Sequence, residues 1–276
     1  MSQKVTELKT YDGIKLFSTI DFADDALANL VIVHGLGEHS GRYAYLTEQL
    51  NKAKFNVFRF DLRGHGKSEG ESAFLKDYQD YIKDLQVVID AAKSMAPDKK
   101  TFLLGHSMGG FISALYGVST KNEVDGIVLS GAATQTPKQA QGAMGTMVKI
   151  LGAIAPKAAM ANDLGKVVSK DQNVVQAYLN DPLNKKKITF GLYNQFLIKG
   201  INYVKSNLAS FVYPTLILHG ENDLIVDPNA SKILFQSIMS EDKTLKTYPN
   251  LYHEIFNEPE RDEVIGDTIQ WLNKRI

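Results

Sequence analysis

The chain has 276 residues, of which 44% are hydrophobic, enough for one large folded domain with an insertion. Its 31 lysines and arginines balance 31 aspartates and glutamates, so no overall charge attracts nucleic acid or an anionic membrane. Cysteine is absent, which excludes disulfides, thiolate metal sites and a cysteine nucleophile. The segment Met1–Glu7 lacks the apolar stretch of a secretion signal, and no apolar run reaches about 18 residues, so we expect a cytoplasmic protein.

The first half of the chain alternates between strand-like and helix-like segments. Apolar residues are contiguous in the strand-like segments and recur every three or four positions in the helix-like ones. This alternation predicts a mainly parallel sheet with helices on both faces, and right-handed crossovers place the loops after the strands at one edge. The expected strands lie near Val5–Thr10, Lys15–Ile20, Leu30–Val33, Asn56–Phe60, Thr101–Leu104 and Gly126–Leu129, and the expected helices near Tyr43–Ala53, Tyr78–Ala92 and Phe111–Tyr116.

A glycine-rich loop, His34–Gly37, follows the third expected strand. The backbone N–H of Leu36 in this loop is a candidate donor to a developing oxyanion. The region also resembles a dinucleotide-binding fingerprint, because glycines at 35, 37 and 41 follow a strand and an aspartate closes the next one. A reductase would also need a Tyr-x-x-x-Lys pair downstream, and that spacing occurs only at positions 11–15, upstream of the loop. The dinucleotide interpretation is therefore the weaker one. A phosphate loop ending at 64–68 is excluded because Asp61 stands where its first glycine is required.

The pentapeptide Gly105–Gly109, with the pattern Gly-x-Ser-x-Gly, is the most informative motif of the chain. It joins an apolar strand to a helical segment, so Ser107 stands at the tip of a tight turn that glycine on either side makes room for. The turn exposes the serine hydroxyl, and the Met108 N–H at the start of the helix points to where an oxyanion would form. The motif predicts that Ser107 is a nucleophile.

Such a serine needs an acid and a base that follow it in the order Ser, Asp or Glu, His. The apolar run Pro214–Gly220 indicates a strand, and Asp223 and Asp227 lie in the loop after it. Asp223 is the better candidate acid, because Asp227 precedes a proline and is expected to cap the next helix. His253 lies in the loop after the last expected strand and is the candidate base.

The other five histidines are expected to have structural roles. His34, His65 and His219 lie at strand ends or turns beside glycines. His106 adjoins the nucleophile, and its ring is expected to point away from it. His39 follows the first glycine loop and is expected to support the site from behind.

The alternation stops between residues 134 and 210, where helix-like segments without a strand pattern are expected to form a cap, leaving residues 1–133 and 211–276 as the core. An apolar stripe in the cap supplies the candidate substrate contacts Met144, Leu151 and Ile154. The stripe could pack on the core, or it could line a flexible acyl passage and touch lipid aggregates, and both can hold for different faces of one helix. The lysines at 185–187 are read as a solvated turn.

Four sequence blocks together resemble the α/β-hydrolase superfamily, and within it the monoacylglycerol lipase and lysophospholipase group. The first block, with the pattern His-Gly-x-Gly-Glu-His-Ser-x-Arg-Tyr, is the most specific, and a fifth, weaker match lies at 180–183 in the cap. The four blocks are His34–Tyr43, Asp61–Gly70, Gly105–Gly110 and His219–Asp223.

The resemblance implies an α/β-hydrolase fold with a helical cap and hydrolysis of carboxylic esters by Ser107, Asp223 and His253, without a cofactor or metal. It implies a small lipid ester as substrate, most simply a monoacylglycerol or a lysophospholipid. The apolar stripe of the cap would then allow transient contact with a membrane surface. Glu38 and Arg42 resemble residues near the glycerol side of such sites, although an internal salt bridge would explain them equally well. A general short-chain carboxylesterase and a non-catalytic small-molecule receptor on the same fold are the alternatives.

Overall fold

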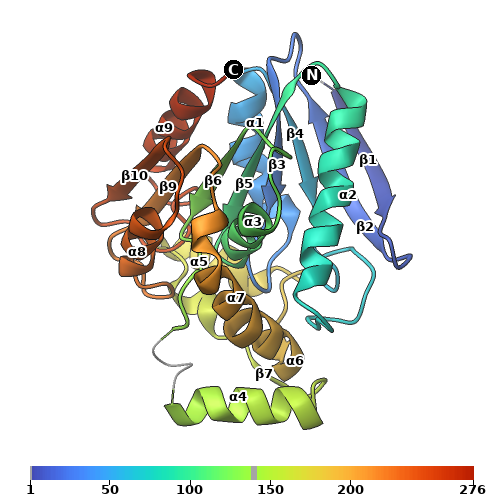
Figure 1. Ribbon diagram of the computed structural model, residues 1–276, viewed down its shortest axis with the longest axis vertical. Helices are drawn as coiled ribbons and strands as arrows, with labels where there is room; N and C mark the ends of the chain where they lie inside the picture. The colour runs from blue at the N-terminus through green and yellow to red at the C-terminus, as the bar shows by residue number, and fades with distance from the viewer. Residues whose placement is uncertain (1, 138–141) are drawn as a thin grey trace.

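The computed structural model describes residues 2–137 and 142–276. Its centre is an eight-stranded sheet with the order β1-β2-β4-β3-β5-β6-β9-β10 (Figure 1). Both pairings of β2, with β1 and with β4, are antiparallel, and the remaining pairings are parallel. The strands are β1 (Ser2–Lys9), β2 (Lys15–Phe22), β3 (Ala28–Val33), β4 (Phe55–Phe60), β5 (Lys100–His106), β6 (Gly126–Ser130), β9 (Thr215–Gly220) and β10 (Lys243–Tyr248).

The central strands β3, β4, β6 and β9 are buried along their whole length. The apolar runs of β3, β6 and β9 predict this for strands covered on both faces, whereas β4 also buries Asn56 and Arg59. One apolar cluster packs α2, α3 and α8 on one face, and a second packs α1 and α9 on the other. The structure thus confirms the expected mostly parallel sheet with helices on both faces. These helices are α1 (Ala44–Lys52), α2 (Gln79–Met95), α3 (Met108–Ser119), α8 (Asn229–Ser237) and α9 (Arg261–Asn273).

The parallel register brings the loops of interest to one edge of the sheet. Val33 at the end of β3 pairs with Gly105 of β5, and Gly105 pairs in turn with Leu129 of β6. The glycine loop after β3, the turn after β5 and the loops after β6, β9 and β10 therefore begin side by side. This is the edge where open parallel sheets bind their ligands.

The segment between β6 and β9 carries short elements that lie beyond this edge, with α4 outermost in Figure 1. These elements are α4 (Gly142–Ile154), β7 (Ala159–Ala161), η3 (Leu164–Val167), α5 (Gln172–Asn180), β8 (Lys187–Thr189), α6 (Phe190–Tyr193), the π-helical η4 (Asn194–Gly200), α7 (Ile201–Ser206) and η5 (Leu208–Ser210). Outside this segment, a short helix, η1 (Ser40–Tyr43), precedes α1. The division into a core of 1–133 and 211–276 and a cap of 134–210 stays a prediction.

One expectation for this segment was wrong. It contains strands, because β7 and β8 pair antiparallel, but three residues each are too few to show a period in the sequence. Of the lysines read as a solvated turn, Lys186 and Lys187 are exposed and Lys187 begins β8. The Lys185 N–H donates to the Gly37 carbonyl at 2.7 Å. The segment is therefore tied to the glycine loop by its backbone.

Within the described ranges, no helix is both long enough and apolar enough to cross a membrane.

Candidate active site

Ser107 occupies the strained turn that its motif predicts. Its φ of 57° lies in the left-handed region, between the end of β5 and the start of α3. A side chain at Gly105 would collide with the Gly109 carbonyl, and one at Gly109 would collide with the Val33 carbonyl. Only glycine fits at either position, so the tight turn explains why the motif has glycine at 105 and 109.

Asp223 and His253 are joined as the sequence predicts. His253 Nδ1 donates to Asp223 Oδ2 at 2.6 Å, and both side chains are buried. Asp223 Oδ1 accepts from the backbone N–H groups of Ile225 and Val226, at 2.8 and 2.9 Å. The loop after β9 therefore holds the carboxylate in place and leaves one of its oxygens to the histidine.

Charge and burial act in opposite directions on this pair. Burial would raise the pKa of Asp223, but His253 and a second histidine bonded to the carboxylate hold that pKa well below its usual value. Burial would lower the pKa of His253, yet the Asp223 carboxylate outweighs burial and raises it. Asp223 is thus an anion that stabilises a positively charged His253.

The alternative acid, Asp227, does what the sequence suggested. Its Oδ1 accepts from the Asn229 N–H at 2.9 Å, and its carbonyl accepts from the Ala230 N–H at 2.8 Å, at the start of α8. Asp227 therefore serves as a cap two residues before α8 begins at Asn229.

Two cavities meet at Ser107. A small one of about 20 Å³, room for about one water, is bordered by Ser107, His253, Glu38 and Tyr178. A larger one of about 330 Å³ is mostly apolar. Its apolar lining includes Met144, Val148, Met160, Leu164, Phe196, Leu197 and Ile225.

The larger cavity sorts the candidate substrate contacts. Met144 of α4 lines it, and so does Val148, a member of the same apolar stripe. Leu151 and Ile154 are not among its lining residues, and Ile154 is 75% exposed on the outer side of α4. Half of the other lining residues come from η3, η4 and the loop after β9, which no sequence period marked.

Glu38 and Arg42 form a buried ion pair at the small cavity. The Glu38 carboxylate accepts from Arg42 at 2.7 Å, from the Gly35 N–H at 2.6 Å and from the Tyr43 hydroxyl at 2.7 Å. Burial would raise the pKa of Glu38, but the Arg42 guanidinium lowers it to about 2. Arg42 also pairs through both terminal nitrogens with Glu254, at 2.6 and 2.7 Å. Sequence reasoning missed Glu254, because its partner lies 212 positions away.

The candidate oxyanion donors come from the loop after β3 and from the start of α3. Met108 is the first residue of α3, where N–H groups have no acceptor within the helix. The loop that carries Leu36 is braced from the cap, because the Tyr178 hydroxyl donates to the Leu36 carbonyl at 3.4 Å and Lys185 bonds to Gly37. Leu36 lines both cavities at Ser107.

The remaining histidines fill several roles. His106, whose ring was expected to point away, packs against the His253 ring with centroids 4.6 Å apart. His39 bonds to Asp181, in the segment between β6 and β9, at 2.9 Å, the supporting position expected of it. His34 and His65 pack together with ring centroids 5.5 Å apart. The part of the chain that is described holds no cluster of three or more His, Asp or Glu side chains suited to a metal ion.

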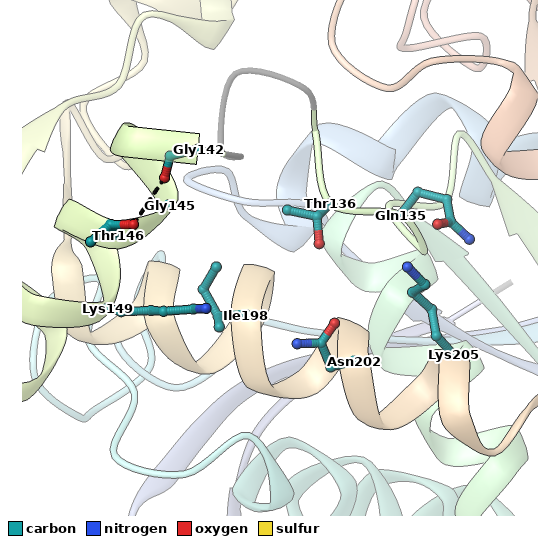
Figure 2. Close-up of a pocket in the computed structure, with 9 residues that line it drawn as sticks. All are labelled: Gln135, Thr136, Gly142, Gly145, Thr146, Lys149, Ile198, Asn202 and Lys205. Atoms are coloured by element: carbon teal, nitrogen blue, oxygen red, sulfur yellow. Dashed lines mark hydrogen bonds between the residues drawn. The ribbon is translucent and has the colours of Figure 1, made fainter.

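A third, polar cavity of about 480 Å³ lies between α4 and the helix formed by η4 and α7. Figure 2 shows Asn202 and Lys205 rising from α7 toward Gln135 and Thr136, while Lys149 reaches from α4 toward Ile198. No sequence motif marked this cavity. It shares α4 and η4 with the apolar cavity but does not include Ser107 among its lining residues.

Comparison with known proteins places the chain in a family. The sequence profile of the family described as "Serine aminopeptidase, S33" matches residues 24–260. A monoacylglycerol lipase of Mycolicibacterium smegmatis is 34% identical, over 88% of this chain and 87% of that protein. A monoglyceride lipase of Mus musculus is 33% identical, over 99% and 92%. The crystal structure of Paleococcus ferrophilus monoacylglycerol lipase superimposes with a TM-score of 0.86 at 32% identity, covering 95% of this chain and 99% of that one. The chain therefore belongs to the serine aminopeptidase S33 family of α/β-hydrolases.

Proposed function

We propose that the protein hydrolyses carboxylic esters of lipids, with monoacylglycerols as the leading substrate class, through an acyl-enzyme on Ser107. The observation that carries the proposal is that Ser107 and the Asp223–His253 pair lie where an apolar cavity of about 330 Å³ opens. A long acyl chain gains free energy from such a cavity, about 0.8 kcal/mol for each methylene removed from water. The names of the relatives support the same substrate class.

In the first step, His253 Nε2 takes the proton of the Ser107 hydroxyl while the serine oxygen attacks the ester carbonyl carbon. Asp223 fixes His253 with the proton on Nδ1, which leaves Nε2 free to act as a base. The N–H groups of Leu36 and Met108 hold the carbonyl oxygen as it becomes negative. His253 then donates its proton to the departing alcohol, and Ser107 carries the acyl group.

In the second step, a water replaces the alcohol, gives a proton to His253 and attacks the acyl carbon. The fatty acid leaves and the serine proton returns from His253. We place this water in the small cavity between Ser107, His253 and Glu38, which has room for about one water molecule.

Glu38 and Arg42 have a bracing role in this proposal. Glu38 already accepts hydrogen bonds from Gly35, Arg42 and Tyr43, so its carboxylate is engaged in holding the loop that carries Leu36. A role in binding the glycerol hydroxyls would need some of these bonds to be released. The bracing role predicts that Glu38→Gln lowers kcat/KM equally for a monoacylglycerol and for the methyl ester of the same acid.

The outer face of α4 provides a surface for transient contact with lipid aggregates. Its apolar side chains Met144, Met147, Ile150 and Ile154 are 41%, 36%, 52% and 75% exposed. Met144 also lines the apolar cavity, so the same helix would touch the aggregate and lead the acyl chain inward.

The proposal is tested by a hydrolysis panel of monoacylglycerols, lysophospholipids and p-nitrophenyl esters of increasing chain length, with Ser107→Ala as the matched inactive variant. We expect kcat/KM to rise with acyl length and monoacylglycerols to exceed lysophospholipids. The highest kcat/KM on acetate esters would favour a general carboxylesterase instead. No turnover of any ester, with no fluorophosphonate adduct on Ser107, would favour a receptor.

A further inference from the structure

The carboxylate of Asp223 has a second buried histidine bound to it. Asp223 Oδ2 accepts from His253 Nδ1 at 2.6 Å and also from His219 Nε2 at 3.0 Å. His219 belongs to β9 and is fully buried, and it does not border either cavity at Ser107. It therefore reaches the reacting atoms only through Asp223.

The surroundings of His219 fix where its protons lie. Nε2 faces the Asp223 carboxylate and, at 3.1 Å, the Val226 carbonyl, which can only accept. Nε2 must therefore carry a proton. When only Nε2 carries a proton, Nδ1 accepts from the Ser231 hydroxyl of α8 at 2.6 Å, and Ser231 is fully buried as well.

We propose that His219 and Ser231 are positioning residues, which hold the acid of the triad as an oriented anion and thereby set the proton affinity of His253. This inference rests on the proposed function, because it assigns a role within the same triad.

The chemistry follows from how Asp223 shares its charge. Oδ1 is engaged by two backbone N–H groups, and Oδ2 by two imidazoles, so the carboxylate cannot rotate away from His253. The hydrogen bond from His219 also offsets part of the negative charge on Oδ2. It therefore weakens the attraction between that oxygen and a protonated His253, and so limits how far the His253 pKa rises. Without His219, His253 would keep its proton to higher pH and would be a base over a narrower range.

Other charged and titratable groups also face the His253 ring. His106 of β5 packs against it, and the electrostatic influences on its pKa include Glu254 and Glu38, which Arg42 pairs. His219 hydrogen-bonds to Asp223, Val226 and Ser231, and His106, Glu254 and Glu38 are not among these partners. A shift caused by His219 can thus be separated from their influence.

The test is the pH dependence of kcat/KM on a soluble p-nitrophenyl ester for His219→Leu, His219→Gln, Ser231→Ala and the parent chain. Leucine removes the donor, whereas glutamine returns an N–H near the position of Nε2. We expect His219→Leu to lower kcat/KM about 10-fold, the lower end of the loss seen when hydrogen bonds that support a site are removed. We also expect the midpoint, the pH at which kcat/KM reaches half its maximum on the acidic side, to move upward by about half a pH unit or more. His219→Gln should restore most of both. Ser231→Ala should shift the midpoint in the same direction by less, because it only weakens the His219 donor.

A matched control is His65→Gln, which changes another fully buried histidine outside both cavities at Ser107. It should leave the midpoint unchanged. Equal midpoints for the parent, His219→Leu and His219→Gln would overturn the inference, even if kcat falls, because a merely structural role lowers the active fraction without moving the profile. If His219→Leu does not fold, the test rests on Ser231→Ala, and a midpoint equal to that of the parent chain would overturn the inference.

Ser107→Ala in the same assay separates this inference from the proposed function. Activity retained by Ser107→Ala contradicts the triad itself. An inactive Ser107→Ala together with unshifted midpoints in the other variants contradicts only the role of His219 and Ser231.

Discussion

Two residues of α4 provide a matched test of acyl binding. Val148 is 3% exposed and lines the apolar cavity, whereas Ile154 is 75% exposed and does not. Burying a valine side chain fully is worth about 1.5–3 kcal/mol, and an acyl chain in the cavity would contact one side of it. We therefore expect Val148→Ser to weaken the binding of a long-chain ester in the transition state by about 1–2 kcal/mol, which is roughly 5–30-fold in kcat/KM.

The assay compares p-nitrophenyl acetate with p-nitrophenyl dodecanoate, both dissolved as monomers, on Val148→Ser, Ile154→Ser and the parent. Acetate leaves the cavity empty, so the ratio of the two kcat/KM values cancels any general damage to α4. Val148→Ser should lower the ratio, and Ile154→Ser should leave it unchanged. Equal losses on both esters, or the same change in ratio from Ile154→Ser, would refute the assignment of this cavity to the acyl chain.

Three further predictions concern charged groups of the site. Asp223→Asn should lower kcat by about 10⁴-fold, as in comparable triads. Asp227→Asn keeps a side-chain oxygen that can cap α8 and should leave kcat within a few-fold, so a deeper loss at Asp227 would show that the wrong carboxylate was chosen. Arg42→Met should lower the free energy of unfolding by about 3–5 kcal/mol in denaturant titration, because it leaves two buried carboxylates without their partner, and a loss below about 1 kcal/mol would contradict the bracing role. His253 acts as a base only when it is neutral, and its pKa is raised above 6.5. We therefore expect kcat/KM to rise with pH and to reach half its maximum above pH 6.5. A midpoint below pH 6.5 would count against Asp223 as the partner of His253.

The sheet and the order of the candidate triad were predictable because each rests on local rules. Continuous apolar runs mark the buried strands, and the Gly-x-Ser-x-Gly pattern demands glycine where the backbone at Ser107 leaves no room for a side chain. The parallel topology then brings Ser107, Asp223 and His253 to one edge, although they lie far apart in the sequence.

The rest depends on contacts that no local pattern records. Arg42 pairs with Glu254, which lies 212 positions away in the sequence. His219 looks in the sequence like any histidine at a strand end, and only the fold shows that it bonds to Asp223. In α4 the apolar stripe identifies the helix but not which of its members face the cavity, because Val148 and Ile154 look alike in sequence. Sequence reasoning therefore located the candidate triad better than the groups that surround it.

Trapping the acyl-enzyme tests the central claim most directly. The protein is mixed with excess p-nitrophenyl dodecanoate, quenched in acid within milliseconds, and its intact mass and peptides are measured alongside Ser107→Ala. We predict a burst of nitrophenol and a single dodecanoyl group on the peptide that contains Ser107, with neither in Ser107→Ala. An acyl group on another residue, or full hydrolysis by Ser107→Ala, would contradict the account.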